Sequence, residues 1–303
     1  MNIVIVNPVA GNGKSKKIFE KVKYSSYFRE ETHFYISEYE GHIQKIIRDV
    51  EATTKITLLF IIGGDGTVNK VVDALSDKSI PIAYIPGGSG NDFARGFSSL
   101  KEPEEIIRRA IEKKKKAKYW LASYELEENP LRTFINCLGF GFDAVVTNSA
   151  RNLSFRDVLS KFKLDSLIYL FALIRELFAY KPLEMTVTFD GVERTFHNVL
   201  FLTVNNQPYM GGGMKINPSA ENNAKELSII VIDSVPKWKI FLLFGTVFIG
   251  VHTLFKDVQI YKAKEVTVRA NRLLPYQVDG EYGETSSAKI RKVKEPIYLK
   301  GTK

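Results

Sequence analysis

The stretch that decides the fold reads ITLLFIIGGDGTVNKVVDAL and spans residues 56–75. It begins with an apolar run, passes through the glycine-rich turn GGDGT at residues 63–67, and continues into a segment with helical spacing of its apolar residues. A buried strand that leads through a tight turn into a helix is the unit from which parallel α/β sheets are built. The N–H groups and the positive dipole end at such a helix start favour phosphate binding.

A second turn of the same design follows the next apolar run. Residues 80–85 (IPIAYI) lead into residues 86–92 (PGGSGND). Glycine lets backbone amides approach a phosphate closely and tolerates positive φ. Two such turns after successive strands, each with an aspartate and a hydroxyl, predict a polyphosphate site with a metal ion at the carboxyl ends of the strands.

The order of strand-like and helix-like segments divides the chain into two parts. Up to about residue 118 the two kinds of segment alternate, which predicts a doubly wound parallel sheet. From residue 119 strand-like runs dominate and are separated by turn residues such as Asp190-Gly191, which predicts an all-β, sandwich-like domain with added helices. We therefore expect an α/β domain over residues 1–118 and a β-domain over residues 119–289.

Composition narrows the class of protein. The chain has 303 residues, 45% hydrophobic and 25% charged, which is typical of a globular protein with an adequate core. A single cysteine, Cys137, allows no internal disulfide, and the first residues lack a secretory pattern, so we expect a cytoplasmic protein. The net charge of +9 attracts anions, and its densest run, residues 113–116 (KKKK), is either a solvated helix end or a contact for lipid headgroups.

Two apolar stretches bear on membrane contact. Residues 158–180 are interrupted by charged side chains, which predicts a helix packed on the β-domain rather than a membrane span. Residues 240–255 are interrupted by Gly, Thr and His alone and are shorter than the roughly 20 residues that span a bilayer. A buried helix and an element that dips into the membrane both remain open for this second stretch.

Together these motifs resemble the diacylglycerol kinase-type lipid kinases, most closely the soluble bacterial members. The GGDGT turn alone is shared with NAD kinases and phosphofructokinase relatives, and the combination is more specific. The resemblance covers nearly the whole chain and is carried by Asn7-Pro8 with Gly11 and Gly13, the two turns, the stretch PGGSGNDFAR at residues 86–95, Asn205, residues 211–213 (GGG), and Asp279-Gly280-Glu281. It implies a nucleotide-binding α/β domain of the NAD kinase and phosphofructokinase type, a β-sandwich domain for the lipid substrate, and a return of residues 290–303 to the first domain.

The resemblance also implies the residues of the site. Asp65 would hold Mg²⁺ that bridges the ATP phosphates, Glu281 would be the general base on the lipid hydroxyl, and Asp279 would lie near the metal or the phosphates. The nucleotide site would consist of Asn7, Gly11, Gly13, Ser37, Gly63, Gly64, Asp65, Gly66, Thr67, Asn69, Gly88, Ser89, Asn91 and Asp92. Other readings stay open: Thr67 as a helix cap, Asn91 and Asp92 as turn formers, and the late acidic motif as a solvated turn.

The chain departs from the family's pattern in two places. Bacterial members carry a D-D-G-x-L-D segment that supplies a structural Mg²⁺ site, whereas residues 223–228 here read NAKELS. Ala224 cannot ligate a hard cation and Lys225 brings a positive charge of its own, so we predict that the structural metal is absent. In addition, Lys70 stands where the family usually has Glu.

The function implied is an ATP- and Mg²⁺-dependent kinase that phosphorylates a hydroxyl of diacylglycerol or a related lipid alcohol, in peripheral contact with the anionic inner face of the membrane. One alternative is an NAD kinase-like enzyme, although residues 205–207 (NNQ) lack that family's acidic nucleoside motif. Another is a catalytically weakened lipid- or nucleotide-binding regulator, motivated by Lys70 and Ala224. Nucleic-acid binding rests on charge alone and is not expected, and a homodimer and the identity of the lipid are left open.

Overall fold

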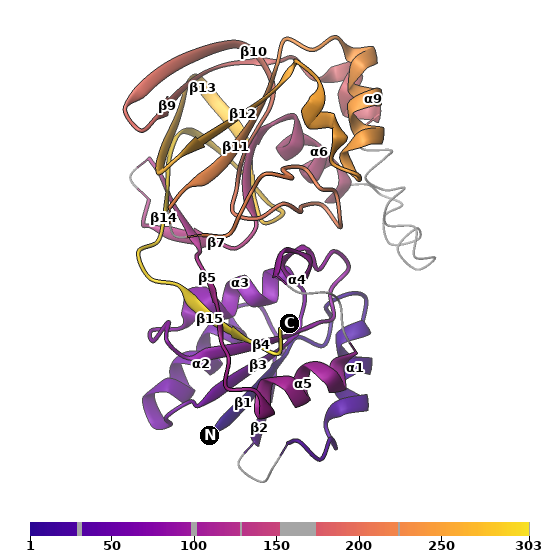
Figure 1. Ribbon diagram of the computed structural model, residues 1–303, viewed down its shortest axis with the longest axis vertical. Helices are drawn as coiled ribbons and strands as arrows, with labels where there is room; N and C mark the ends of the chain where they lie inside the picture. The colour runs from indigo at the N-terminus through magenta and orange to yellow at the C-terminus, as the bar shows by residue number, and fades with distance from the viewer. Residues whose placement is uncertain (29–31, 98–101, 128, 152–173, 224, 303) are drawn as a thin grey trace. The chain divides into compact units, whose positions relative to one another are not determined.

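The computed structural model describes residues 1–303 with the exception of residues 29–31, 98–101, 128, 152–173, 224 and 303. The chain divides into two compact units, one formed by Met1–Leu121 with Val293–Lys303 and the other by Ala122–Lys292. Figure 1 shows helices interleaved with strands in the first unit and mainly strands in the second. The predicted fold class, an α/β domain followed by a β-sandwich-like domain with added helices, is confirmed.

The first unit is built on a six-stranded sheet with the strand order β2-β1-β3-β4-β15-β5. Its strands are β1 (Asn2–Val6), β2 (Thr32–Ile36), β3 (Leu58–Gly63), β4 (Pro81–Pro86), β5 (Ala117–Tyr119) and β15 (Ile297–Lys300). Its helices are α1 (Lys14–Val22), α2 (His42–Thr53), α3 (Asp65–Ala74), α4 (Asp92–Phe97) and α5 (Pro103–Glu112). All strand pairs from β2 to β15 are parallel, and every residue of β3 is buried, as expected for a strand covered on both faces.

The last strand of the chain completes this first sheet. β15 pairs in parallel with β4 and antiparallel with β5, and Leu299 lies opposite Ile82 on one side and Ala117 on the other. Ile297 and Leu299 are each 1% exposed. Residues from both ends of the chain therefore share one core.

The run of residues 119–126, which reads as one strand in the sequence, is divided between the two units. β5 ends at Tyr119 in the first sheet, and β6 (Ala122–Leu126) begins in the second sheet. The division falls where the chain passes from one unit to the other, because the first unit ends at Leu121.

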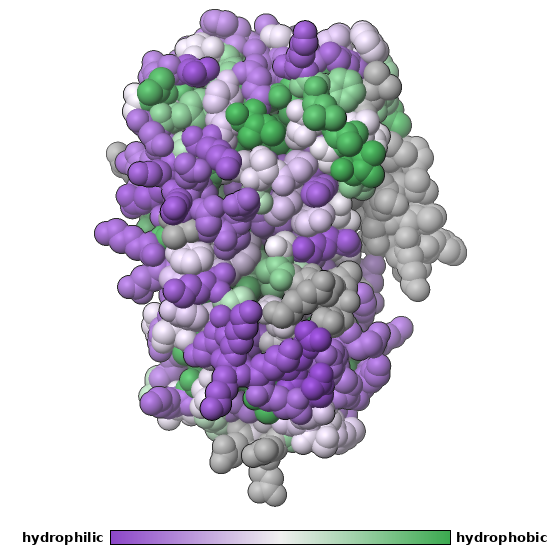
Figure 2. Space-filling model, in the orientation of Figure 1, coloured by the Kyte–Doolittle hydropathy of each residue, from purple (hydrophilic) through white to green (hydrophobic). Residues whose placement is uncertain are grey.

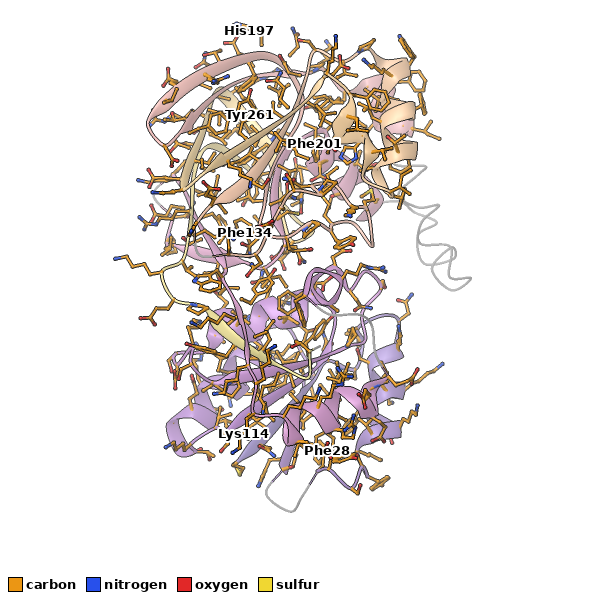
Figure 3. The ribbon with its side chains drawn as sticks, viewed as in Figure 1. Phe28, Lys114, Phe134, His197, Phe201 and Tyr261 are labelled. Atoms are coloured by element: carbon orange, nitrogen blue, oxygen red, sulfur yellow. The ribbon has the colours of Figure 1, made fainter. Side chains whose placement is uncertain are left out.

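The second unit is a nine-stranded antiparallel β-structure. Its strand order is β12-β11-β10-β8-β13-β14-β6-β7, and β9 pairs with both β10 and β13. The remaining strands are β7 (Arg132–Phe134), β8 (Cys137–Gly141), β9 (Leu183–Phe189), β10 (Val192–Asn205), β11 (Leu227–Asp233), β12 (Val258–Ala263), β13 (Glu265–Val278) and β14 (Glu281–Lys292). Phe134 and Phe201, labelled in Figure 3, belong to the buried apolar interior of this unit.

Helices cover part of the second unit. They include α6 (Phe142–Arg151), α9 (Lys237–Val247) and the 3₁₀ turn η1 (Val251–Leu254). The predicted helix at residues 158–180 falls largely outside the described residues, although residues 174–179 are helical and Leu177 is buried. The buried helix considered for residues 240–255 is buried on one face and exposed on the other. Among the described helices, none has both the length and the apolar character needed to cross a bilayer.

We expect that replacing Leu299 by Ala lowers the free energy of unfolding by about 2–5 kcal/mol, because the change removes most of a buried side chain and leaves a cavity in the core on one face of the sheet. The measurement is urea unfolding of the full chain followed by circular dichroism. Ile36→Ala, in β2 of the same sheet, is the control, since 43% of that residue is already exposed. Equal losses for the two variants would contradict the place of β15 inside the core.

Candidate functional site

Three glycine-rich loops meet at the carboxyl edge of the first sheet, after β1, β3 and β4. The Gly87 N–H donates to the Gly63 carbonyl at 2.7 Å. A Cβ atom at Gly88 would lie 2.5 Å from the Gly64 Cα, and one at Gly11 would lie 2.2 Å from the Gly87 carbonyl oxygen. Side chains cannot be accommodated where backbones approach this closely, so glycine is required there. The structure thus brings the three predicted loops together.

Asn7 connects the first of these loops with the second. Its Nδ2 donates to the Thr67 Oγ1 at 3.0 Å, and its backbone N–H donates to the Ile62 carbonyl at 3.0 Å. Thr67 is buried at the start of α3. The pair therefore fixes the loop after β1 against the helix that follows β3.

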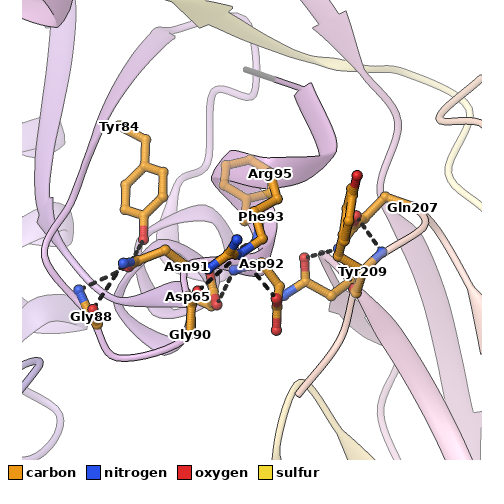
Figure 4. A network of polar contacts seen from close by, with 11 residues as sticks. Asp65, Tyr84, Gly88, Gly90, Asn91, Asp92, Phe93, Arg95, Gln207 and Tyr209 are labelled. Atoms are coloured by element: carbon orange, nitrogen blue, oxygen red, sulfur yellow. Dashed lines mark hydrogen bonds and ion pairs between the residues drawn. The ribbon is translucent and has the colours of Figure 1, made fainter. Parts of the chain in front are cut away.

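The Asp65 carboxylate lies across the start of α4 (Figure 4). Its Oδ2 accepts the backbone N–H of Asp92 at 2.9 Å, and its Oδ1 accepts that of Phe93 at 3.1 Å. A negative charge is stabilised at a helix N-terminus by the N–H groups and the helix dipole. Each carboxylate oxygen can accept more than one bond.

Asn91 shapes the second glycine turn (Figure 4). It has a φ of 56°, its Oδ1 accepts the Gly88 N–H at 2.9 Å, and its Nδ2 donates to the Gly88 carbonyl at 2.8 Å. The Tyr84 hydroxyl lies 3.1 Å from the same Oδ1, and burial, with the nearby aspartates, raises the pKa of Tyr84 well above its usual value. These contacts agree with the turn-forming reading of Asn91. Asp92 is also buried, with its Oδ1 3.8 Å from the Arg95 Nε.

The remaining predicted residues of the nucleotide site differ in exposure. Ser89 is exposed on the second turn, and Ser37 follows β2 with its backbone N–H bonded to the Val6 carbonyl at 2.9 Å. The Asn69 Oδ1 is buried without a hydrogen-bond partner among the described residues. Lys70, the departure from the family's Glu, forms an ion pair with Glu40 at 3.2 Å.

Ser15 is a residue to which the sequence analysis gave no role. It is fully buried at the start of α1, and its Oγ has no hydrogen-bond partner in the described part of the chain. A Cβ atom at Gly87 would lie 2.2 Å from that Oγ. The Lys14-Ser15 pair that follows the first glycine loop was the signal that could have identified it.

The donor set fits a magnesium ion that arrives with a nucleotide. Within the described ranges, no group of three or more His, Cys, Asp or Glu side chains is placed to hold a metal. Mg²⁺ keeps several waters and is commonly bound by one or two carboxylates together with substrate phosphates, and Asp65 supplies one such carboxylate. At the second site, Ala224 lies outside the described residues and the Asn223 Oδ1 accepts the Lys225 N–H at 2.8 Å, so the absence of a structural metal stays a prediction.

The late acidic motif forms the turn between β13 and β14. Asp279 is partly buried, and its carboxylate accepts the backbone N–H groups of Ile135 at 2.8 Å, Asn136 at 2.9 Å and Cys137 at 3.1 Å. Glu281, the first residue of β14, is exposed. The two acids of the motif therefore have different surroundings: Asp279 is bonded to the backbone, and Glu281 lies at the surface.

Gln277 holds the same turn from its other side. Its Oε1 accepts the Gly280 N–H at 2.8 Å, and its Nε2 donates to the Asp143 Oδ2 at 2.8 Å. Burial raises the pKa of the Asp143 carboxyl to about 6, against the lowering effect of the bond from Gln277. Neither residue belongs to the site predicted from the sequence. The spacing of Gln277 two residues before the acidic motif, on the inward side of β13, was the available signal.

Buried amides lie beneath this region of the second unit. The Gln207 Nε2 donates to the Asn136 Oδ1 at 3.0 Å, and the Asn206 Nδ2 donates to the Ile135 carbonyl at 3.1 Å. Lys292 bonds to the Asn206 Oδ1, and burial lowers the pKa of its ammonium group to about 7. Asn206 and Gln207, two of the three residues that would be the nucleoside motif of an NAD kinase, thus bond within the second unit.

Comparisons with known families give two matches. A diacylglycerol kinase catalytic domain matches residues 2–120, and a YegS C-terminal NAD kinase β-sandwich-like domain matches residues 136–298. A protein named putative lipid kinase YtlR from Bacillus subtilis is 30% identical over 302 residues, covering 98% of each chain. The diacylglycerol kinase of Mycobacterium tuberculosis (strain H37Rv) is 27% identical over 241 residues, which cover 78% of this chain and 74% of that protein.

Solved structures show the same fold. A putative diacylglycerol kinase from Bacillus anthracis has a TM-score of 0.75 and 21% identity, with 98% of this chain and 94% of that chain covered. An NAD kinase from Archaeoglobus fulgidus, solved in complex with ATP, has a TM-score of 0.53 and 14% identity, with 99% and 93% covered. The likeness to both extends over the two units.

Gly88→Ala should lower the free energy of unfolding by about 1–3 kcal/mol, because the added methyl group would press against the Gly64 backbone. Thermal unfolding of the purified protein measures the loss. Gly66→Ala is the matched control, since a Cβ there meets no atom within 4 Å among the described residues and Ala favours the helix. A loss as large for Gly66→Ala would contradict the close packing of the two turns.

The partly buried Asp143 should make the free energy of unfolding fall as pH rises from about 4 to 6. Its folded pKa of about 6 lies above the ordinary value of 3.8, so in this window the native carboxyl keeps a proton that the unfolded chain has released. The difference in unfolding free energy between the wild type and Asp143→Asn should therefore decrease by about 2–3 kcal/mol across the window. Urea unfolding at several pH values measures this, and a difference that does not change with pH would refute it.

Proposed function

The chain belongs to the diacylglycerol kinase family of lipid kinases, and from this we propose that it transfers the γ-phosphate of ATP to a hydroxyl of diacylglycerol or a related lipid alcohol. The observation that carries the proposal is that one chain contains both a phosphate-binding type of loop arrangement and a turn that exposes an acidic residue. The first is the convergence of three glycine loops around Asp65. The second is a rigidly held turn that leaves Glu281 exposed.

The glycine loops support a nucleotide triphosphate as the phosphate donor. Helices α1, α3 and α4 all begin at this edge of the sheet, and helix starts with glycine-rich approaches are suited to phosphate groups. The buried Asn69 Oδ1 provides an acceptor that the described protein does not satisfy. The NAD kinase of the same fold, solved with ATP, supports the choice of ATP.

We assign Asp65 to the magnesium ion and Glu281 to the acceptor. When bound, Mg²⁺ would neutralise charge on the phosphates during transfer. Glu281 would accept the proton of the lipid hydroxyl as its oxygen forms the bond to phosphorus. We assign Asp279 a positioning role, because its oxygens already accept three backbone N–H groups that fix residues 135–137 beside the turn.

The proposed acceptor is a lipid that resides in a bilayer, so the reaction would take place at a membrane surface. We propose that the protein works in the cytoplasm, in peripheral contact with the anionic inner face of the membrane. The exposed lysine run at residues 113–116, which includes Lys114 in Figure 3, follows the end of α5 and agrees with both earlier readings. An NAD acceptor is less favoured, because residues 205–207 contain no acid and the side chains of Asn206 and Gln207 bond within the second unit.

The purified protein should transfer label from γ-labelled ATP to a species in the organic phase when it is given Mg²⁺ and detergent-dispersed diacylglycerol or bacterial lipid extract. Glu281→Gln should lower kcat by about 100- to 10,000-fold, the range for loss of a general base, without lowering the melting temperature. Chelation of Mg²⁺ should abolish transfer, and its addition should restore it.

Glu284→Gln is the matched control, since this acid is also exposed on β14 and should keep wild-type activity. A parallel reaction with NAD in place of the lipid tests the alternative that NAD is the phosphate acceptor. Label in NADP alone, or undiminished lipid labelling by Glu281→Gln, would refute the proposal.

A further inference from the structure

Helix α9 carries apolar side chains on the face that should meet water. Its inward stripe, at helical spacing, packs in the core of the second unit and consists of Ile240, Leu243 and Val247. On the other side, Trp238, Phe241 and Phe248 are 66%, 44% and 51% exposed. A surface helix of a globular protein normally has polar or charged residues at such positions.

The exposed apolar surface continues beyond the helix. Ile249, Val251 and Leu254 are 70%, 38% and 83% exposed, and η1 packs against α9. Figure 2 shows apolar surface gathered over this part of the second unit. Scattered apolar residues on a surface are ordinary, whereas a contiguous group marks an interaction site. We call these six residues the α9–η1 face.

The turn that presents this face is anchored from beneath. His252 is 1% exposed, and its Nε2 lies 2.7 Å from the Ile216 carbonyl oxygen. Gly250, with a φ of 79°, packs so closely that a Cβ atom would lie 2.7 Å from the Pro218 Cγ. Because these neighbours are fixed inward, the outward direction of Ile249 and Leu254 is a built feature of the fold.

The charge of the segment favours an anionic lipid surface. Residues 236–256 contain Lys237, Lys239 and Lys256 and no Asp or Glu. Lys239 is paired with Asp257, and Lys256 is exposed. A tryptophan with lysines at the margin of an apolar surface suits the bilayer interface, where the indole lies at headgroup level and ammonium groups reach the phosphates.

A second copy of the chain is a less suitable occupant. In a two-fold dimer the same face meets itself, so residues of like charge come close together. Asp257, just beyond the segment, offsets the charge of Lys239, and residues 236–256 contain no acid to offset Lys237 and Lys256.

We propose that the α9–η1 face docks the protein on anionic bilayers, with its apolar side chains in the boundary between headgroups and acyl chains. The helix has 11 residues, fewer than the roughly 20 that span a bilayer, so it lies in the plane of the interface. This inference rests on the proposed function in one respect: the lipid acceptor of a kinase resides in such a bilayer.

The test is co-sedimentation with vesicles in the absence of ATP. Vesicles of phosphatidylcholine with phosphatidylglycerol should bind the wild type, and vesicles of phosphatidylcholine alone should bind it less. Leu254→Glu and Phe248→Glu should each weaken binding to the anionic vesicles by about tenfold or more, because a carboxylate would be placed in the apolar boundary. Both sites are exposed, so the melting temperatures should not change.

Leu273→Glu and Val192→Glu are the matched controls, since these residues are 59% and 61% exposed elsewhere on the same unit. Both should bind vesicles as the wild type does. Equal vesicle binding by all four variants would overturn the proposal.

Trp238 provides a second readout. The chain has two tryptophans, so Trp120→Phe leaves Trp238 as the single reporter. Its emission should shift to shorter wavelength when anionic vesicles are added, and an unchanged spectrum would overturn the proposal. Light scattering completes the test: if Leu254→Glu turned a dimer into a monomer with vesicle binding unchanged, the face would be a self-interface instead.

Kinase assays on short-chain diacylglycerol in detergent micelles separate this inference from the proposed function. There, Leu254→Glu should match the wild type. If vesicle binding depends on Leu254 but no lipid is phosphorylated, the proposed function is refuted and the docking face is supported. If lipid is phosphorylated normally but vesicle binding does not depend on Leu254, the docking face is refuted and the proposed function is supported.

Discussion

Backbone-to-backbone contact between glycine loops is the constraint on which the first unit depends. Gly88 lies so close to the Gly64 backbone that it has no room for a side chain, and Gly11 is equally confined by Gly87. This approach brings the start of α4 within reach of the Asp65 carboxylate. The position of the carboxylate and the direction of two helix starts are therefore consequences of residues that have no side chains.

The second unit reaches a similar end by another route. Its acidic turn is fixed by two side chains: Asp279 bonds to the backbone of residues 135–137, and Gln277 bonds to Gly280. Glu281 itself contributes little to this scaffold and stays exposed. In both units, the residues that build a turn are different from the acidic residue that the turn presents. Replacing a residue of the first kind disturbs the turn, whereas replacing the presented residue removes a functional group.

The sequence predicted the features that depend on local chemistry. Apolar runs gave β3 and β4 because buried parallel strands are apolar throughout, and the glycine turns were evident because few other residues fit there. Nonlocal features were not visible in the sequence. One is the division of residues 119–126 between two sheets, and another is the bond between Gln277 and Asp143, which joins β13 to helix α6, 134 residues earlier in the chain. The sequence did not show which face of α9 is exposed, because apolar residues on the exposed face and on the buried face cannot be distinguished by residue type. The return of the last residues came from resemblance alone.

The place of β15 has a consequence for how the protein is made. A ribosome releases the chain from its first residue onward, and N-terminal domains usually fold while synthesis continues. Here the strand between β4 and β5 is made of Ile297–Lys300, which are translated after every strand of the second unit. The first unit therefore cannot complete its sheet until the strands of the second unit have been synthesised. A nascent chain that stops before residue 297 lacks a strand from the interior of the first sheet.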